Sequence, residues 1–249
     1  MIKTESTKEK ALEYINCIVY GGSGTGKTSS AKTLPTEKTL ILSTEKGLLP
    51  LAGHDFQFVP IKSWNDLLNT YKELLEAENQ DKYRVLFIDS LNELNDLCKE
   101  HIIKVERPQK KIEIGKVYDD LLTQQDYSLL DTKMRRMIRL FRDLPYHQIF
   151  TCGEDDKKDE ETGYIKSLPA LNGKLQYQLG GYFDEIFRLI TKEEEKGKPH
   201  ARYLLTSKTE KTITKDRSGA LEFYEPADWS LIFGKIKEHY AKIGKEIAA

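Results

Sequence analysis

The sequence has little cysteine. Its 249 residues include three cysteines, Cys17, Cys98 and Cys152, with no CxxC pair among them. Cys17 and Cys152 each lie in a short apolar run, where a buried free thiol is the ordinary state. An odd number of cysteines without metal-ligand spacing argues against a disulfide framework and a zinc site, and it suits a reducing compartment. We therefore expect a cytoplasmic protein.

Long apolar runs and an excess of one charge are also missing. No stretch has the apolar length needed to cross a bilayer, and residues 1–10 are polar and charged, unlike a signal peptide. Lys and Arg together number 39 and Asp and Glu number 40, so the formal net charge is −1. Without a whole-molecule basic field, any nucleic-acid contact must come from a local cluster. No membrane partner is expected.

Apolar runs rich in β-forming residues alternate with segments of helical periodicity. The expected strands are residues 15–20, 39–43, 56–60, 85–88, 148–152, 185–190 and 203–206. The expected helices are residues 27–34, 64–77, 91–102, 128–143 and 228–243. This alternation predicts an α/β fold with a mostly parallel central sheet and helices on both faces.

No linker or internal repeat divides the chain. We expect an N-terminal arm over residues 1–13 and a single domain over residues 14–249. Two polar stretches, about 104–125 and 154–174, lack clear periodicity and are expected to be long loops. Residues 164–168 within the second stretch could instead pair as an edge strand.

A phosphate-binding loop follows the first expected strand. The pattern G-x-x-x-x-G-K-[ST] is matched in full between that strand and the next expected helix. Glycines let the backbone point its N–H groups at phosphate oxygens, and the helix N-terminus favours an anion. Lys27 is expected to reach the β and γ phosphates of ATP, and Thr28 to ligate Mg²⁺. The nucleotide-contacting set is Gly21, Gly22, Ser23, Gly24, Thr25, Gly26, Lys27, Thr28 and Ser29.

Two carboxylates complete the expected site. Asp89 ends the apolar run at 85–88, where a carboxylate would hold the water shell of the metal, although Asp is also a common helix N-cap. Glu45 follows the strand at 39–43 and would orient or deprotonate water if that strand lies beside the Asp89 strand. A solvated loop acid is the alternative for Glu45, and Glu93 and Glu154 are weaker rivals for the base.

Together these segments resemble the RecA-type P-loop ATPase core. The resemblance is carried by residues 21–28, 42–45, 85–90 and 215–219. It implies that Glu45 is the catalytic base and that Lys215 and Arg217 of the K-D-R-S-G turn contact the γ-phosphate of a neighbouring subunit in a homo-oligomer. From the residues alone, a solvated basic turn is the alternative. A transferring phosphoryl group gains several kcal/mol from such an arginine.

By length and layout the chain is similar to short phage-encoded Sak-type ATPases linked to single-strand annealing and recombination. This resemblance implies a host-cytosol location, single-stranded DNA as ligand, and a single-strand-binding or replication protein as a further partner. RecA proteins end the strand equivalent to 148–152 with a polar Asn-Gln sensor. Here the segment reads Thr151-Cys152-Gly153, so Thr151 or Glu154 would have to substitute.

The two long loops correspond to the DNA-contacting loops of RecA-like proteins. Basic side chains can neutralise backbone phosphates, although such loops are commonly just solvated. The candidate DNA contacts are Lys104, Arg107, Lys110, Lys111, Lys116 and Lys174.

Three functions follow in order of preference. The first is a DNA-stimulated, oligomeric ATPase of phage recombination. The second is a nucleotide-gated helicase loader or assembly factor with little turnover. The third is a small-molecule kinase, which needs an arginine-rich lid. Its only candidate arginines, at 135–142, have the spacing of a solvated helix face.

Overall fold

A computed structural model describes residues 14–45, 47–107, 122–158, 160, 163–193 and 200–248. The exposure of side chains is described up to residue 243. The expected arm at 1–13 lies outside these residues, as do Lys110, Lys111 and Lys116. Among the helices within the described ranges, none is long and apolar enough to span a membrane.

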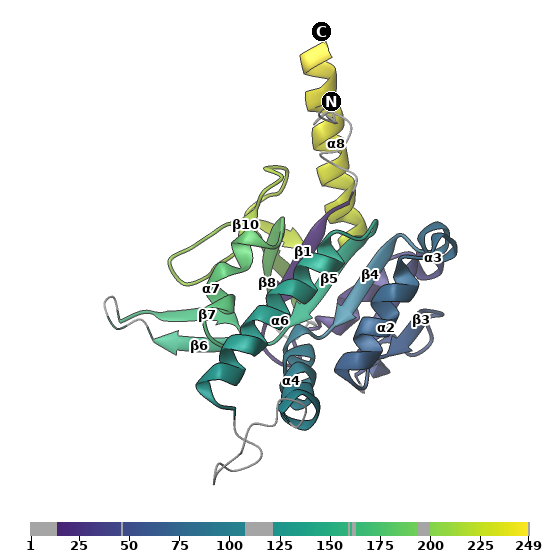
Figure 1. The fold of residues 1–249 in the computed structure, drawn as a ribbon. Coiled ribbons are helices and arrows are strands. Elements are labelled where there is room, and N and C mark those ends of the chain that lie inside the picture. Colours follow the sequence, from purple (N-terminus) through teal and green to yellow (C-terminus); the bar gives the residue numbers. More distant parts are fainter. Residues whose placement is uncertain are drawn as a thin grey trace, which may run out of the picture.

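A nine-stranded sheet forms the centre of the molecule (Figure 1). Its strands are β1 (Asn16–Tyr20), β2 (Thr39–Ser43), β3 (Gln57–Pro60), β4 (Val85–Asp89), β5 (His147–Cys152), β8 (Glu185–Lys192), β9 (Ala201–Leu205), β10 (Lys215–Asp216) and β11 (Tyr224–Pro226). The order is β11-β9-β8-β1-β5-β4-β2-β3, and β10 pairs with β8. All pairs from β3 to β8 are parallel, whereas β9, β10 and β11 pair antiparallel.

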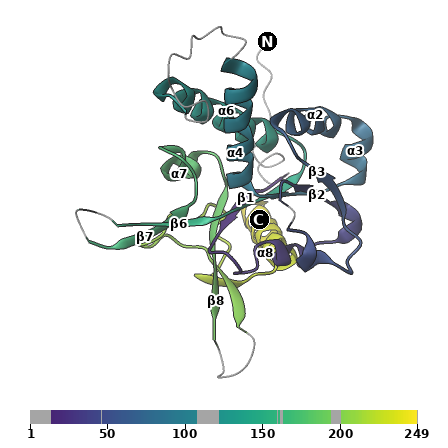
Figure 2. The same ribbon diagram turned by 90° about the horizontal axis from the view of Figure 1, so that it is seen from below.

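Helices cover both faces of this sheet. The α-helices are α2 (Trp64–Leu74), α3 (Ala77–Lys82), α4 (Leu91–His101), α6 (Gln124–Arg142), α7 (Leu175–Gln178) and α8 (Trp229–Ala248). Shorter turns are the 3-10 helices η1 (Thr28–Thr33), η2 (Thr36–Lys38), η3 (Leu49–Leu51) and η5 (Leu179–Gly181), and the π-helix η4 (Ile102–Glu106). In Figure 2 the sheet separates α2, α4 and α6 from α8.

Side chains along the buried strands point alternately into two separate hydrophobic cores. In β1, Ile18 and Tyr20 belong to the core that α2, α4 and α6 cover, while Cys17 and Val19 belong to the core that contains Trp229 of α8. Successive strand side chains point to opposite faces, so a strand with both faces covered is apolar throughout. The expected α/β fold, with a mostly parallel central sheet and helices on both faces, is confirmed.

Several boundaries differ from the expectation. The helix expected at 27–34 is the shorter η1, and the stretch at 154–174 contains a hairpin of β6 (Glu154–Lys158) and β7 (Ile165–Pro169). β6 reads EDDKK and has no apolar alternation, so its strand state depends on pairing with β7 rather than on a local pattern. Both ends of the expected loop at 104–125 are helical instead, because η4 runs to Glu106 and the Thr123 capping box starts α6 at Gln124.

Candidate nucleotide site

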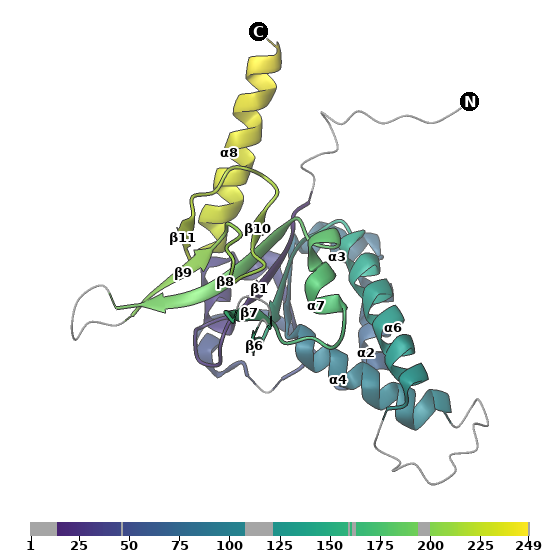
Figure 3. The same ribbon diagram turned by 90° about the vertical axis from the view of Figure 1, so that its left-hand side faces the viewer.

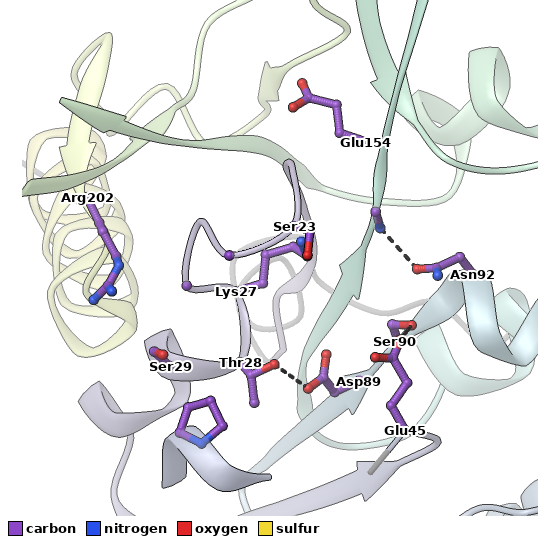
Figure 4. Close-up of a pocket in the computed structure, with 14 residues that line it drawn as sticks. Ser23, Lys27, Thr28, Ser29, Glu45, Asp89, Ser90, Asn92, Glu154 and Arg202 are labelled. Carbon is purple, nitrogen blue, oxygen red and sulfur yellow. Dashed lines mark hydrogen bonds between the residues drawn. The ribbon is translucent and has the colours of Figure 1, made fainter. Parts of the chain in front are cut away.

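A cavity of about 510 Å³ lies at the carboxyl edge of the parallel strands (Figure 4). Because β1, β2, β4 and β5 are parallel neighbours, the segments that follow them converge at this edge. The lining residues are Ser23, Gly24, Gly26, Lys27, Thr28, Ser29, Glu45, Pro50, Asp89, Ser90, Asn92, Gly153, Glu154 and Arg202. The structure thus brings together segments that lie far apart in the sequence.

The phosphate-binding loop joins β1 to η1. Gly24 and Gly26 have φ values of 77° and 101°, a region that side chains rarely adopt. A Cβ on Gly21 would lie 2.7 Å from the carbonyl oxygen of Leu189 in β8. Thr25 Oγ1 donates to the carbonyl of Gly22 at 2.9 Å and braces the loop. Glycine is therefore required here both by backbone conformation and by close packing.

Lys27 lies across the inside of this loop. Its Nζ donates to the carbonyl oxygens of Gly21 at 2.7 Å and Gly22 at 2.9 Å. Burial lowers the pKa of Lys27, and the nearby carboxylate of Asp89 opposes that shift. A partly desolvated cation beside backbone amides is well suited to a polyphosphate.

Thr28 and Asp89 meet at the base of the cavity. Thr28 Oγ1 donates to Asp89 Oδ2 at 2.7 Å, and Thr151 Oγ1 donates to Asp89 Oδ1. Burial raises the pKa of Asp89, and these two hydrogen bonds lower it. Mg²⁺ prefers oxygen ligands, and the Thr28 hydroxyl and the Asp89 carboxylate place two such oxygens side by side, so these residues fit the metal. In the described ranges no group of three or more His, Cys, Asp or Glu could hold a metal.

Glu45 lies beside Asp89, as expected from neighbouring β2 and β4. Ser43 pairs with Asp89 in the parallel ladder, and Thr44 N donates to the Asp89 carbonyl at 2.8 Å. Ser90 Oγ donates to Glu45 Oε1 at 2.5 Å, which holds the exposed carboxylate at the cavity. The N-cap of α4 is Ser90, so the capping alternative for Asp89 is wrong.

The other candidates for the base and for the sensor differ from Glu45 in their position relative to the cavity. Thr151 is fully buried, and its hydroxyl is bonded to Asp89. Glu154 lines the cavity, but its Oε1 accepts from Arg188 Nε at 2.5 Å. Glu93 lies in the first turn of α4 and is not among the cavity residues.

Arg202 is a cavity residue that the sequence did not reveal. It belongs to β9, and its Nε donates to the carbonyl of Thr25 at 3.1 Å. A Cβ on Gly26 would lie 2.4 Å from this Nε. In Figure 4 Arg202 and Glu45 lie on opposite sides of the loop. The only signal in the sequence is an arginine in a short β-forming run, which is too common to single out.

The K-D-R-S-G turn lies away from this cavity. Lys215 and Asp216 pair with Ile186 and Glu185 at the start of β8, whereas the phosphate-binding loop follows the other end of the adjacent, parallel β1. Lys215 Nζ donates to the carbonyls of Gly180 and Phe183, each at 2.8 Å. The side chain of Arg217 is 69% exposed and pairs with Asp184 at 3.0 Å. Neither residue is brought to the cavity of its own chain.

Of the candidate DNA contacts, Lys104, Arg107 and Lys174 lie within the described residues. The expectation that Arg107 contacts DNA is wrong. Its side chain is 4% exposed and forms an ion pair with Asp126, so it is not presented to solvent. Lys104 is exposed and pairs with Glu100 at 2.9 Å. Lys174 is exposed beside α7. Burial of Arg107 follows from the docking of η4 against the start of α6, which the sequence did not predict.

The fold and the cavity define the chain as a P-loop nucleotide-binding protein. It belongs to the AAA domain family, whose match covers residues 13–218. Such a P-loop implies ATP, as a rule with Mg²⁺. Among curated proteins no match was found.

Two solved structures of low sequence identity are similar. One is a prototypical ATPase from the type III secretion system of pathogenic bacteria, with 12% identity over 71% of this chain and a TM-score of 0.46. The present chain spans 52% of that ATPase. The other is a KaiC-like protein from the hyperthermophilic archaeon Pyrococcus horikoshii OT3, with 14% identity over 81% of each chain and a TM-score of 0.38.

Proposed function

We propose that the protein is a Mg²⁺-dependent ATP hydrolase. The observation that carries this proposal is the 2.7 Å contact between Thr28 Oγ1 and Asp89 Oδ2 beside the Glu45 carboxylate, at the mouth of a complete phosphate-binding loop. Thr28 and Asp89 would hold Mg²⁺, directly or through its water shell. The metal would neutralise charge on the β and γ phosphates.

Glu45 is the proposed base. It accepts a proton from water as the water oxygen bonds to the γ-phosphorus and the bond to the bridging oxygen breaks, giving ADP and inorganic phosphate. Ser90, which donates to Glu45 Oε1 at 2.5 Å, orients the carboxylate. Lys27 and the loop amides bind the phosphates and stabilise their charge.

The test separates binding from turnover. Glu45→Gln should lower kcat by roughly 10²–10⁴-fold, the usual contribution of a general base, while ATP affinity stays close to wild type. Glu93→Gln, on α4 outside the cavity, is the matched control and should retain turnover. Full activity in Glu45→Gln would refute the assignment of the base, and absence of ATP binding in the folded wild type would refute the site.

The protein works as an oligomer in which Arg217 completes a neighbour's site. Arg217 follows residues that pair with the start of β8, away from the cavity of its own chain, and its side chain is 69% exposed. Both features support action on another subunit. Lys215 supports the same turn through its two carbonyl contacts and would have to exchange them to reach a phosphate. ATPase activity per chain should rise with protein concentration.

Mixed subunits test this arrangement directly. Lys27→Ala removes a phosphate ligand, and Arg217→Ala removes the residue given to the neighbour. Each variant alone should be nearly inactive, and a mixture should regain activity in sites that combine an intact Lys27 with an intact Arg217. Arg136→Ala, an exposed arginine on α6, is the control for charge removal. Wild-type turnover by Arg217→Ala at every protein concentration would refute sharing of sites.

The biological setting proposed is single-strand annealing or recombination in a phage, with stimulation by single-stranded DNA. The length and layout of the chain support this setting through their resemblance to Sak-type ATPases, as do residues 125–127 and 180–185. ATP hydrolysis measured with and without single-stranded DNA tests it, and equal rates would count against it.

A nucleotide-gated assembly factor is the second candidate. The observation in its favour is that Thr151 is buried against Asp89, which leaves β5 without a free polar side chain at its carboxyl end. ATP-dependent capture of a partner that is unchanged by Glu45→Gln would support this candidate. The kinase alternative has no such support, because the arginines of α6 are not among the cavity residues.

A further inference from the structure

Two adjoining hollows form a groove on the face shown in Figure 3, where α7, β7 and β10 lie close together. Their volumes are about 450 Å³ and about 530 Å³. Both are lined by Tyr177, Lys208 and Ile213, so they lie side by side. The first extends to Tyr164 and the second to Lys215. The groove is separate from the nucleotide cavity.

Exposed aromatic rings line this groove. Tyr177 is 58% exposed and Tyr164 is 46% exposed. Lys211 Nζ lies 5.6 Å from the centre of the Tyr164 ring. Two half-exposed rings in one concavity present apolar surface that a ligand could cover.

The charge around these rings is mainly positive. Lys166 and Lys208 line the groove, and Lys211 lies beside Tyr164. The acidic lining residues are Glu210 and Asp216. Asp216 accepts hydrogen bonds from Ser218 and Gly219 of its own turn. Four lysines, Lys166, Lys208, Lys211 and Lys215, therefore stand against two acids. This local excess contrasts with the chain's formal net charge of −1.

We infer that this groove binds single-stranded nucleic acid. Lysines can neutralise backbone phosphates, while the Tyr177 ring offers a face on which an unpaired base can stack. A duplex keeps its bases stacked on one another and would gain only the phosphate contacts. An acidic peptide would use the lysines but leave the aromatic faces without planar partners. The groove therefore deepens the DNA-linked part of the proposed function and rests on it.

The groove also provides a physical link to the nucleotide cycle. Its second hollow includes Lys215 and Asp216, which belong to the turn that carries Arg217. A strand bound in this hollow would contact the same turn that is proposed to complete the neighbour's site. Stimulation by DNA then requires no contact between DNA and the nucleotide cavity.

Fluorescence anisotropy with a labelled oligothymidylate tests the inference in the full-length protein. Tyr177→Ala should weaken binding about tenfold, whereas Tyr177→Phe keeps the stacking face and should bind like wild type. Lys208→Ala should weaken binding and reduce the slope of log K against log salt by about 0.7, the value for one phosphate contact to a single strand. Phe58→Ala, 53% exposed on β3, and Lys62→Ala, exposed near it, are matched controls and should leave binding unchanged.

The outcomes separate this inference from the ATPase proposal. ATP hydrolysis without DNA should be unchanged in Tyr177→Ala and Lys208→Ala, while its stimulation by DNA is lost. Unchanged oligothymidylate binding in both variants would overturn the inference, as would equal affinity for a duplex of the same length. Displacement of the oligonucleotide by polyglutamate at equal charge concentration would favour an acidic peptide and also overturn it. Oligothymidylate binding by a wild-type protein that hydrolyses no ATP would instead count against the ATPase proposal and leave this inference standing.

Discussion

The contact between Gly26 and Arg202 can be tested by a double-mutant cycle on folding stability. Gly24 and Gly26 both have positive φ, but a Cβ on Gly24 would meet nothing within 4 Å, whereas one on Gly26 would lie 2.4 Å from Arg202 Nε. Gly24→Ala therefore reports backbone strain alone. Gly26→Ala reports strain together with displacement of the arginine.

The magnitudes follow from this geometry. Alanine in the left-handed region costs about 1–2 kcal/mol. Displacing Arg202 also ends its 3.1 Å bond to the Thr25 carbonyl, which is worth about 1 kcal/mol. Gly24→Ala should thus lower the free energy of unfolding by about 1–2 kcal/mol and Gly26→Ala by about 2–3 kcal/mol. Because Arg202→Ala has already lost that bond, the Gly26 cycle should show a coupling of about 1 kcal/mol.

Urea denaturation followed by circular dichroism, without nucleotide, measures each corner of the cycle. The cycle of Gly24→Ala with Arg202→Ala is the control and should be additive. Equal effects of the two glycine substitutions, together with no coupling between Gly26 and Arg202, would refute the packing of the arginine on the loop. In steady-state kinetics, Arg202→Ala should raise the KM for ATP more than it lowers kcat, because Arg202 and Glu45 lie on opposite sides of the loop (Figure 4).

Three further predictions concern stability. Glu185 is 1% exposed, and burial, with Asp216 nearby, raises its pKa from an ordinary 4.5 to about 8. Between these two pKa values the folded state binds more protons than the unfolded state, so the free energy of unfolding should fall as pH rises from about 4.5 to about 8. Glu185→Gln should flatten this decline when stability is measured by urea titration across the same pH range. Trp229→Phe should lose about 1 kcal/mol, since it removes the 2.9 Å bond from Nε1 to Ser30 Oγ, whereas Trp229→Ala should lose about 3–5 kcal/mol; equal losses would contradict the packing role of the ring. Arg107→Ala should lose about 3–5 kcal/mol because it leaves the buried carboxylate of Asp126 without an opposite charge, and Arg107→Ala/Asp126→Ala should recover part of that loss. A stable single variant with weakened DNA binding would instead favour a DNA contact for Arg107.

Local patterns in the sequence determined the nucleotide-binding part of this protein. The phosphate-binding loop is contiguous, and Asp89 directly follows a buried run, so chemistry and spacing identify them without long-range information. The alternation of strands and helices predicted a parallel sheet, and parallel strands bring their carboxyl ends to one edge. The juxtaposition of Glu45 with Asp89 needed one further fact, the adjacency of β2 and β4, which only the structure supplied.

Tertiary structure alone decided which distant side chains share a surface. Arg202 reaches the loop because β9 returns beside β8, and the groove joins Tyr164, Tyr177 and Lys208 from a hairpin, a short helix and a loop. Arg107, chosen for its place in a basic stretch, is buried because η4 packs beside the start of α6. Periodicity shows which side of an element is buried, but strand order and helix docking depend on contacts between residues far apart in the chain, so no local pattern encodes these neighbours.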